Sequence, residues 1–244
     1  MKYLYISLLA GLLCQPVLAQ VPTHSVKTQD RAAHTSANVS SAAPPTIRLK
    51  QLDLAATSTE AQRKNRQGEL PSFGKVRPLA LDLLPAGHWE PAAGGQLWKL
   101  TLTSPGALSL NFLFDKFFLP PGAELSIYNA DRSVAIGPVT SAQNTAAKVF
   151  ATDLLKGDAV TFELFEPAAS KGQSILHAAQ VVHGYQDLTG GQPYAGYGQA
   201  APCNVDINCA AGNDWRTESN AVALIILPNG QYSTGTLLNR VTIA

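Results

Sequence analysis

Apolar and polar side chains alternate along several stretches of the chain between residues 80 and 187. Apolar residues occupy every second position from Trp98 to Leu102, from Leu108 to Phe114 and from Val160 to Leu164. A period of two is typical of a strand that turns one face to a hydrophobic core. Turn-forming residues separate these stretches: Gly94-Gly95, Ser104-Pro105-Gly106, Pro120-Pro121-Gly122, Gly137-Pro138 and Lys156-Gly157-Asp158. The pattern predicts an all-β chain with an antiparallel β-sandwich over residues 80–187.

The segment before these strands has a different composition. Residues 20–46 are mainly Ala, Ser, Thr, Val and Pro, which bury too little apolar surface to offset the entropy lost on ordering. Thr57 and Glu60 have the spacing of a capping box, so a short helix is expected there, and Gly68 is expected to end it. Residues 20–79 are therefore expected to be a low-complexity, disordered segment that contains one short helix.

Residues 1–19 have the three parts of an export signal. Lys2 provides the positive start, Leu4 to Leu13 the apolar run, and a small-residue site places cleavage between Ala19 and Gln20. The apolar run is too short to cross the ~30 Å of hydrocarbon in a bilayer. We therefore predict a secreted protein, exported by a Sec-type signal with transit through a periplasm, and not held in a membrane after the signal is removed.

Composition and charge narrow the range of partners. Hydrophobic residues make up 45% of the chain and charged residues 14%, which is enough apolar material for a core. Loss of the signal leaves 17 basic and 17 acidic residues. Nucleic acids and anionic membranes both need a clustered excess of positive charge, so neither is expected as a partner. A monomer is expected.

Two histidines and four carboxylates are candidates for sites of chemistry. His177 and His183 are six apart, which would place them on the same side of a strand, but no further ligand lies at a suitable spacing. They are predicted to be surface or turn residues and not a zinc site. Two pairs of carboxylates could act as acid and base, but solvated side chains are the preferred interpretation. These pairs are Glu163 with Glu166 and Asp153 with Asp158. The sequence therefore predicts no metal site and no cofactor.

The C-terminal part of the chain carries the most specific motifs. Cys203 and Cys209 enclose the segment CNVDINC. An apolar run follows from Ala221 to Leu227, and then the segment STGTLLN from Ser233 to Asn239. This order resembles the start of the catalytic domain of a bacterial lysyl endopeptidase, a secreted trypsin-like serine protease with a chymotrypsin-like double barrel. Several upstream pieces resemble the pro-region of such precursors: Gly87-His88-Trp89, Gly95 to Trp98, Ser104 to Ala107, Leu119 to Leu125, Gly157-Asp158 and His183-Gly184-Tyr185.

The resemblance implies a precursor with a sandwich pro-domain, a linker over residues 188–202, and the truncated start of a protease barrel over residues 203–244. The family hydrolyses peptide bonds in proteins and peptides with a Ser–His–Asp triad. The segments that carry these three residues in the family are not found among the 244 residues. We therefore assign no catalytic residue, and we expect this chain as given to be inactive.

The cysteines and the linker depart from the family pattern. Removal of the signal leaves Cys203 and Cys209 in an oxidising compartment. By resemblance their partners lie downstream of Ala244, so here the two thiols stay free, bridge each other or link to another molecule. There is no Lys or Arg between Lys171 and Arg216, so a Lys-specific enzyme is not expected to release its own pro-region in that interval.

Two alternatives belong to other functional classes. One is a secreted, non-catalytic β-sandwich that binds a protein or glycan through exposed aromatic residues such as Trp89, Tyr194 and Tyr197. The other is a free pro-domain that acts in trans as an inhibitor or chaperone of a protease. In each alternative the sandwich carries the function, and the C-terminal segment is an accidental or docking element.

Overall fold

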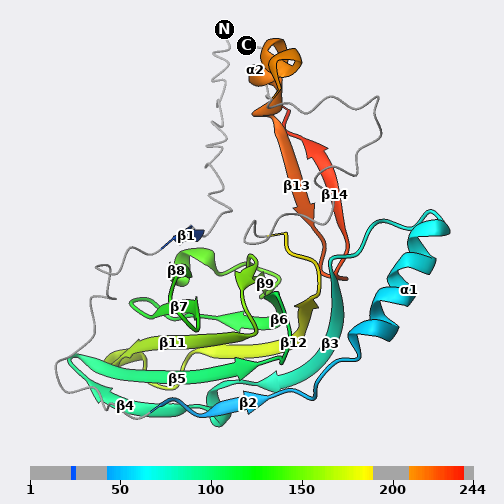
Figure 1. Ribbon diagram of the computed structural model, residues 1–244. Helices are drawn as coiled ribbons and strands as arrows, with labels where there is room; N and C mark the ends of the chain where they lie inside the picture. The colour runs from blue at the N-terminus through cyan, green and yellow to red at the C-terminus, as the bar shows by residue number, and fades with distance from the viewer. Residues whose placement is uncertain (1–22, 26–42, 189–208, 239–244) are drawn as a thin grey trace, which may run out of the picture.

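The computed structural model describes residues 23–25, 43–188 and 209–238. Two sheets packed face to face make up most of the described chain (Figure 1). The larger sheet runs in the order β1 (Thr23–Ser25), β8 (Val134–Val139), β7 (Glu124–Asn129), β11 (Ala159–Pro167), β5 (Gly95–Thr103) and β2 (Thr46–Arg48). Its seventh strand, β4 (His88–Ala92), also pairs with β5. All pairings are antiparallel except that of β2 with β5.

The smaller sheet has five strands and covers the other side of the core. Its order is β10 (Leu155–Lys156), β6 (Ser109–Phe118), β12 (Ile175–Gly184) and β3 (Gly74–Asp82), and β9 (Phe150–Ala151) also pairs with β6. Short 3-10 turns connect strands at Leu84–Ala86, Ser141–Gln143 and Ala168–Ser170. The predicted all-β fold and antiparallel sandwich are confirmed. The sheets also include β2 and most of β3, which lie before residue 80.

The core is one cluster of apolar side chains drawn from both sheets. The alternating positions predicted from the sequence provide its centre: Trp98, Leu100, Leu102, Leu110, Phe112, Phe114, Val160, Phe162 and Leu164 all have no exposed surface. Phe112 and Phe162 meet edge to face across the two sheets, with ring centroids 5.0 Å apart. Leu108 is the exception, since it precedes β6 and is 42% exposed. Burial of these side chains is the main source of stability in such a sandwich.

The helix α1 (Leu54–Arg66) lies beside β3, as Figure 1 shows. It begins three residues before the predicted capping residue. The carboxylate of Asp53 accepts the N–H of Ala56, so Asp53 caps the helix, and the Thr57 hydroxyl donates to the carbonyl of Asp53. The expected end is confirmed, because Gly68 follows the last turn with a φ of +82°.

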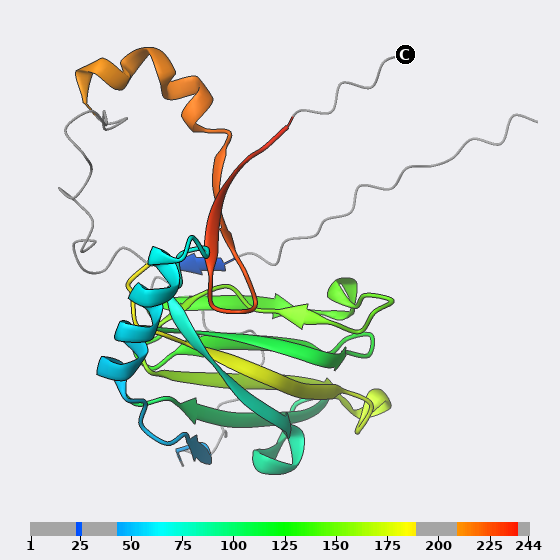
Figure 2. The same cartoon turned by 90° about the vertical axis from the view of Figure 1, so that its right-hand side faces the viewer.

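The C-terminal strands form a separate hairpin. β13 (Val222–Ile226) and β14 (Tyr232–Thr236) pair only with each other in regular strand pairing, and a 3-10 turn (Ala210–Trp215) and α2 (Arg216–Ser219) precede them. Figure 2 shows the hairpin standing out from the sandwich on the end formed by its own turn. The hairpin therefore touches the sandwich mainly at that turn. Within the described residues no helix has the length and apolarity needed to cross a membrane.

Candidate functional site

A serine and a histidine meet at one end of the sandwich. Ser104 follows β5, and His183 lies near the end of β12, on the same side of the strand as the core residue Val181. The Oγ of Ser104 is 2.7 Å from Nδ1 of His183, and Arg77 on β3 donates to the same Oγ at 2.9 Å. Because Arg77 is only a donor, the hydroxyl hydrogen is free to point at His183.

This pair does not have the geometry of a nucleophile and its base. Both side chains have no exposed surface, so a substrate carbonyl cannot reach the serine oxygen. Burial, and then the charge of Arg77, lower the pKa of His183, so the ring is held neutral. We interpret the cluster as a buried polar contact. It links the residue that follows β5 to strands β12 and β3. The prediction that His183 is a surface or turn residue is therefore wrong.

The two histidines of β12 are not brought together. The Nδ1 of His177 contacts Oδ1 of Asp115 on the neighbouring strand β6, where both side chains are partly exposed. The hydrogen bond from His177 lowers the pKa of Asp115. Register shifts in β12 between the two histidines break the simple alternation from which a shared side was expected. In the described part of the chain no group of three or more His, Cys, Asp or Glu side chains is placed to hold a metal ion.

Glu166 is a buried carboxylate and not a solvated one. It has no exposed surface and accepts hydrogen bonds from the N–H of Gly172 at 2.7 Å, the N–H of Ser174 at 3.0 Å and Nε2 of Gln96 at 2.8 Å. Burial alone would raise the pKa of this carboxyl. The backbone donors outweigh it and hold the pKa of Glu166 below its usual value. The prediction of a solvated side chain is wrong for Glu166, because a loop closes over the carboxylate and its N–H groups bind it.

Glu163 points outward as expected but is only 9% exposed. It lies on β11, in the middle of the larger sheet, where the Nζ of Lys99 is 3.6 Å away and the hydroxyl of Tyr128 donates at 3.1 Å. Burial, and then the negative charge of Glu163, raise the pKa of Tyr128. The prediction of a solvated side chain is wrong for Glu163 too. It is confirmed for Asp153 and Asp158, which are exposed.

The turn of the C-terminal hairpin contacts the sandwich at the start of β3. The carbonyl of Gly230 accepts the N–H groups of Phe73 and Gly74, at 2.9 and 3.2 Å. The N–H of Tyr232 donates to the carbonyl of Pro71 at 3.0 Å. Ser72 and Gln231 form an antiparallel bridge between these bonds. Residues 71–74 and the facing side chains of β12 are called the turn socket below.

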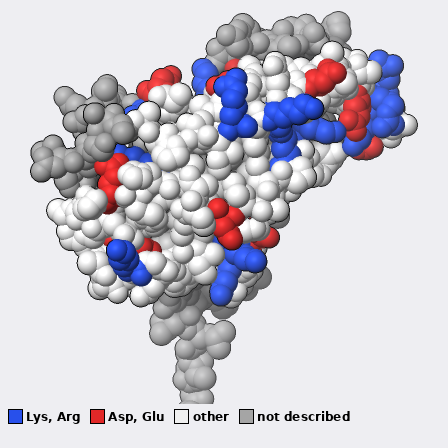
Figure 3. Space-filling model, turned by 90° about the horizontal axis from the view of Figure 1, so that it is seen from below, with Lys and Arg blue, Asp and Glu red and all other residues white. Residues whose placement is uncertain are grey.

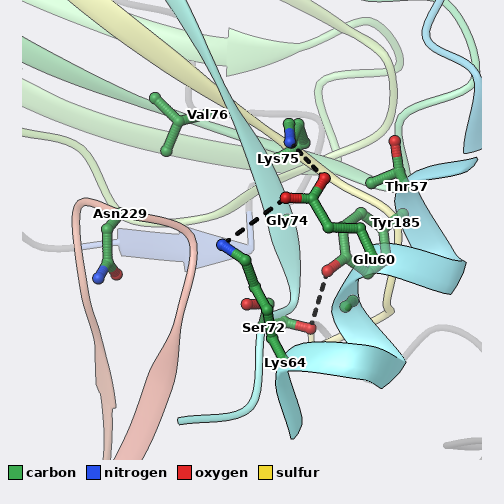
Figure 4. Close-up of a pocket in the computed structure, with 10 residues that line it drawn as sticks. Thr57, Glu60, Lys64, Ser72, Gly74, Lys75, Val76, Tyr185 and Asn229 are labelled. Atoms are coloured by element: carbon green, nitrogen blue, oxygen red, sulfur yellow. Dashed lines mark hydrogen bonds and ion pairs between the residues drawn. The ribbon is translucent and has the colours of Figure 1, made fainter. Parts of the chain in front are cut away.

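A polar hollow of about 230 Å³ lies beside the turn socket, between α1, β3 and the hairpin turn (Figure 4). Glu60 of α1 is at its centre, with the Nζ of Lys75 at 2.9 Å and the Nζ of Lys64 at 3.7 Å. The hydrogen bond from Lys75 lowers the pKa of Glu60. A carboxylate fixed between two ammonium groups is a poor proton donor, so the cluster is suited to holding α1 against β3.

The hollow is bounded on another side by Tyr185, whose hydroxyl donates to the carbonyl of Ser72 at 3.2 Å. Burial raises the pKa of this phenol. On the face seen in Figure 3, Lys and Arg side chains gather toward one side with Asp and Glu side chains among them. Such a mixture is typical of a solvated surface.

The remaining predicted residues are placed as follows. Cys209 is exposed and its thiol is free. Cys203, Ala19 and Gln20 lie outside the described residues, and so do Tyr194 and Tyr197. Trp89 is partly buried and packs against Trp98, with ring centroids 6.3 Å apart. It is therefore a core aromatic and not an exposed contact residue.

The sequence contains one signal for the hairpin turn. Leu227-Pro228-Asn229-Gly230 is a turn sequence between two strand-like runs, which predicts a hairpin, but nothing in it indicates what the turn rests on. Comparison with protein-family models gives no match, and no solved structure matches the chain significantly.

Proposed function

We propose that the chain is the precursor region of a secreted serine endopeptidase that resembles lysyl endopeptidase. Residues 1–19 would be the export signal, the sandwich the pro-domain, and residues 203–244 the opening of the trypsin-like catalytic domain. The proposal rests on the order of the motifs from Gly87 to Asn239, which resembles that of such precursors. Its substrates would be proteins and peptides.

The observation that carries the proposal is the separateness of the C-terminal hairpin. β13 and β14 add to neither sheet of the sandwich. Their apolar side chains are open, with Val222 58%, Leu224 47% and Ile225 44% exposed. A two-stranded ribbon is marginal by itself and needs further strands or a packing partner. This is what is expected of the first hairpin of a barrel whose other strands are supplied by a longer product.

The chemistry would belong to that longer product. Trypsin-like hydrolysis needs a serine nucleophile, a histidine base and an aspartate that orients the histidine, all around an open cleft. The buried pair Ser104 and His183 lacks access to substrate, and the family's triad segments do not occur in these 244 residues. The proposal therefore assigns no catalytic residue here and predicts no peptidase activity for the chain by itself.

A direct test is to examine the DNA that follows the codon of Ala244 in all three frames. A Thr-Ala-x-His-Cys segment and a later Gly-Asp-Ser-Gly segment are expected. The longer product should cleave peptide substrates, and it should be inhibited by reagents that modify an active-site serine, whereas residues 1–244 should not cleave. Absence of both segments in every frame would remove the protease proposal.

A second candidate is a pro-domain that acts in trans as an inhibitor or chaperone. The observation that favours it is the single core shared by the two sheets, which is closed without any side chain of the hairpin. The chain should then slow the peptidase activity of a mature relative when added at micromolar concentration. Unchanged activity over that range would eliminate this candidate.

A further inference from the structure

The contact between the turn socket and the hairpin turn joins segments that are more than 150 residues apart in the chain. On one side are residues 71–74, which lead into β3, and on the other the loop from Pro228 to Gln231. We propose that the turn socket is the surface by which the pro-domain recognises the catalytic domain, through the turn of its first hairpin. This inference rests on the proposed function and names the partner element: a tight β-hairpin turn with glycine at its end.

The shape of the turn socket selects for glycine. Gly230 has a φ of +79°, which favours glycine for backbone reasons alone. A Cβ added to Gly230 would also overlap the carbonyl oxygen of Gly74 and come within 3.3 Å of Cγ1 of Val182. The two backbones therefore touch where only hydrogen atoms fit. A turn with any side chain at this position would have to rise out of the turn socket.

Backbone groups and two glutamine side chains form hydrogen bonds between the turn and the sandwich. Nε2 of Gln180 on β12 donates to the carbonyl of Pro228 at 2.6 Å. Nε2 of Gln231 donates back to the carbonyl of Leu70 at 3.3 Å. Together with the bridge, these bonds engage the turn much as an added strand engages a sheet edge. Affinity would come from the main chain, and selectivity from the fit around Gly230.

The sandwich side of the contact is held independently of the hairpin. Phe73 has no exposed surface, and its carbonyl accepts the N–H groups of Tyr185 and Gln186. These two bonds do not involve the hairpin, and they tie residue 73 to the segment that follows β12. The turn socket is thus a fixed part of the sandwich, at the start of β3 and the end of β12. A fixed surface can bind a hairpin that is no longer covalently attached, because it does not have to be ordered on binding.

Hydrogen exchange in the full chain tests the contact itself. The amides of Phe73, Gly74 and Tyr232 should be protected in the wild type. In Gly230→Ala they should exchange about tenfold faster or more, because the added Cβ lifts the turn. The matched control is Gly94→Ala, at the same φ of +79° but with nothing within 4 Å of the added Cβ. It should leave these three amides unchanged.

A second variant separates the turn socket from the turn. Gln180→Ala removes the bond to Pro228 without altering the hairpin. The amide of Tyr232, which donates to Pro71, should therefore exchange faster, while the other amides of β13 and β14 keep their wild-type rates. Unprotected amides at Phe73, Gly74 and Tyr232 in the wild type would overturn the proposal. Equal rates in Gly230→Ala and Gly94→Ala would overturn it too.

Cutting the chain after it has folded tests whether the sandwich binds the hairpin without covalent attachment. A specific protease site inserted between Gly190 and Gly191 of the full chain allows the linker to be cut after folding. Both fragments should then elute together in gel filtration, and they should separate in Gly230→Ala. Immediate separation of the wild-type fragments would overturn the inference.

The two proposals fail in different ways. If downstream frames encode a protease but the wild-type amides exchange freely, the recognition surface is refuted and the protease remains. If the amides are protected and no frame encodes a protease, the proposed function fails. The turn socket is then only an internal contact of this chain, and the recognition proposal falls with it.

Discussion

The hydroxyl oxygen of Ser104 lies 2.7 Å from Nδ1 of His183, and neither side chain is exposed to solvent. Because the chain is proposed to belong to a serine protease precursor, such a pair invites a catalytic interpretation. The geometry opposes it, because both side chains are buried and no substrate carbonyl can reach the hydroxyl oxygen, to which Arg77 also donates at 2.9 Å. The contact is therefore expected to affect stability and not chemistry.

Replacing Ser104 by alanine should lower stability and change nothing else. The substitution leaves Nδ1 of His183 buried without its partner, and the Nε2 of that ring already lacks one. A buried polar group left unsatisfied costs about 1–3 kcal/mol in the free energy of unfolding. Urea denaturation measures this loss. Ser58→Ala, at an exposed helix position, is the control and should be neutral within about 0.5 kcal/mol.

The neutral state of His183 should make stability depend on pH. Its pKa in the folded protein is lowered by burial and by Arg77, so below about pH 6.5 the unfolded chain binds more protons than the folded one. This stability is complete above about pH 6.5 and is lost as the pH falls toward the folded pKa. Urea midpoints between pH 5 and 8 should show the slope. It should flatten in His183→Gln and persist in His88→Gln, whose histidine is exposed.

Glu166 should produce a second loss of stability at lower pH. Its folded pKa lies below the usual value, so its contribution is complete above about pH 4.3 and falls as the pH drops through the folded pKa. Glu166→Gln puts an amide donor against N–H donors, and we expect a loss of about 1–3 kcal/mol at pH 7. The variant should also lack the acid slope. Glu218→Gln, at an exposed site, should have the wild-type free energy of unfolding at pH 7 and the wild-type acid slope.

The open hairpin should make the chain self-associate. Val222 is 58% exposed on a ribbon whose outer edges pair with no strand among the described residues. Edge strands of this kind join other chains unless charge prevents it. Val222→Lys should therefore lower light scattering on heating, with little change in the unfolding midpoint. Leu108→Lys alters a similarly exposed apolar residue (42%) on the sandwich, and an equal effect there would contradict an edge-specific cause.

The sequence predicted the elements that depend on local pattern. The alternation around Trp98 and Phe162 fixes which side of a strand is buried, and the core follows from it. Gly68 is required for a positive φ, so the end of α1 was also visible. The true cap, Asp53, was missed because Thr57 and Glu60 imitate a capping box one turn later.

The sequence did not predict the buried polar groups, since their partners are distant. Glu166 depends on Gln96, 70 residues away, and His183 on Ser104, 79 residues away. Alternation shows which way such a side chain points but not what covers it. The turn socket could not be predicted for the same reason, because Gly230 and Gly74 are distant in the sequence and meet only when the chain is folded. Contacts of this kind need the three-dimensional arrangement.

The attachment of the C-terminal ribbon through its turn alone has a consequence for how the molecule comes apart. A part that shares few apolar contacts with the rest can open while the remainder stays closed. We expect the segment from residue 209 to 238 to be trimmed first by added proteases, leaving a long-lived core of residues 43–188. The molecule would thus unfold in two steps, with the C-terminal ribbon opening at a lower free energy than the sandwich.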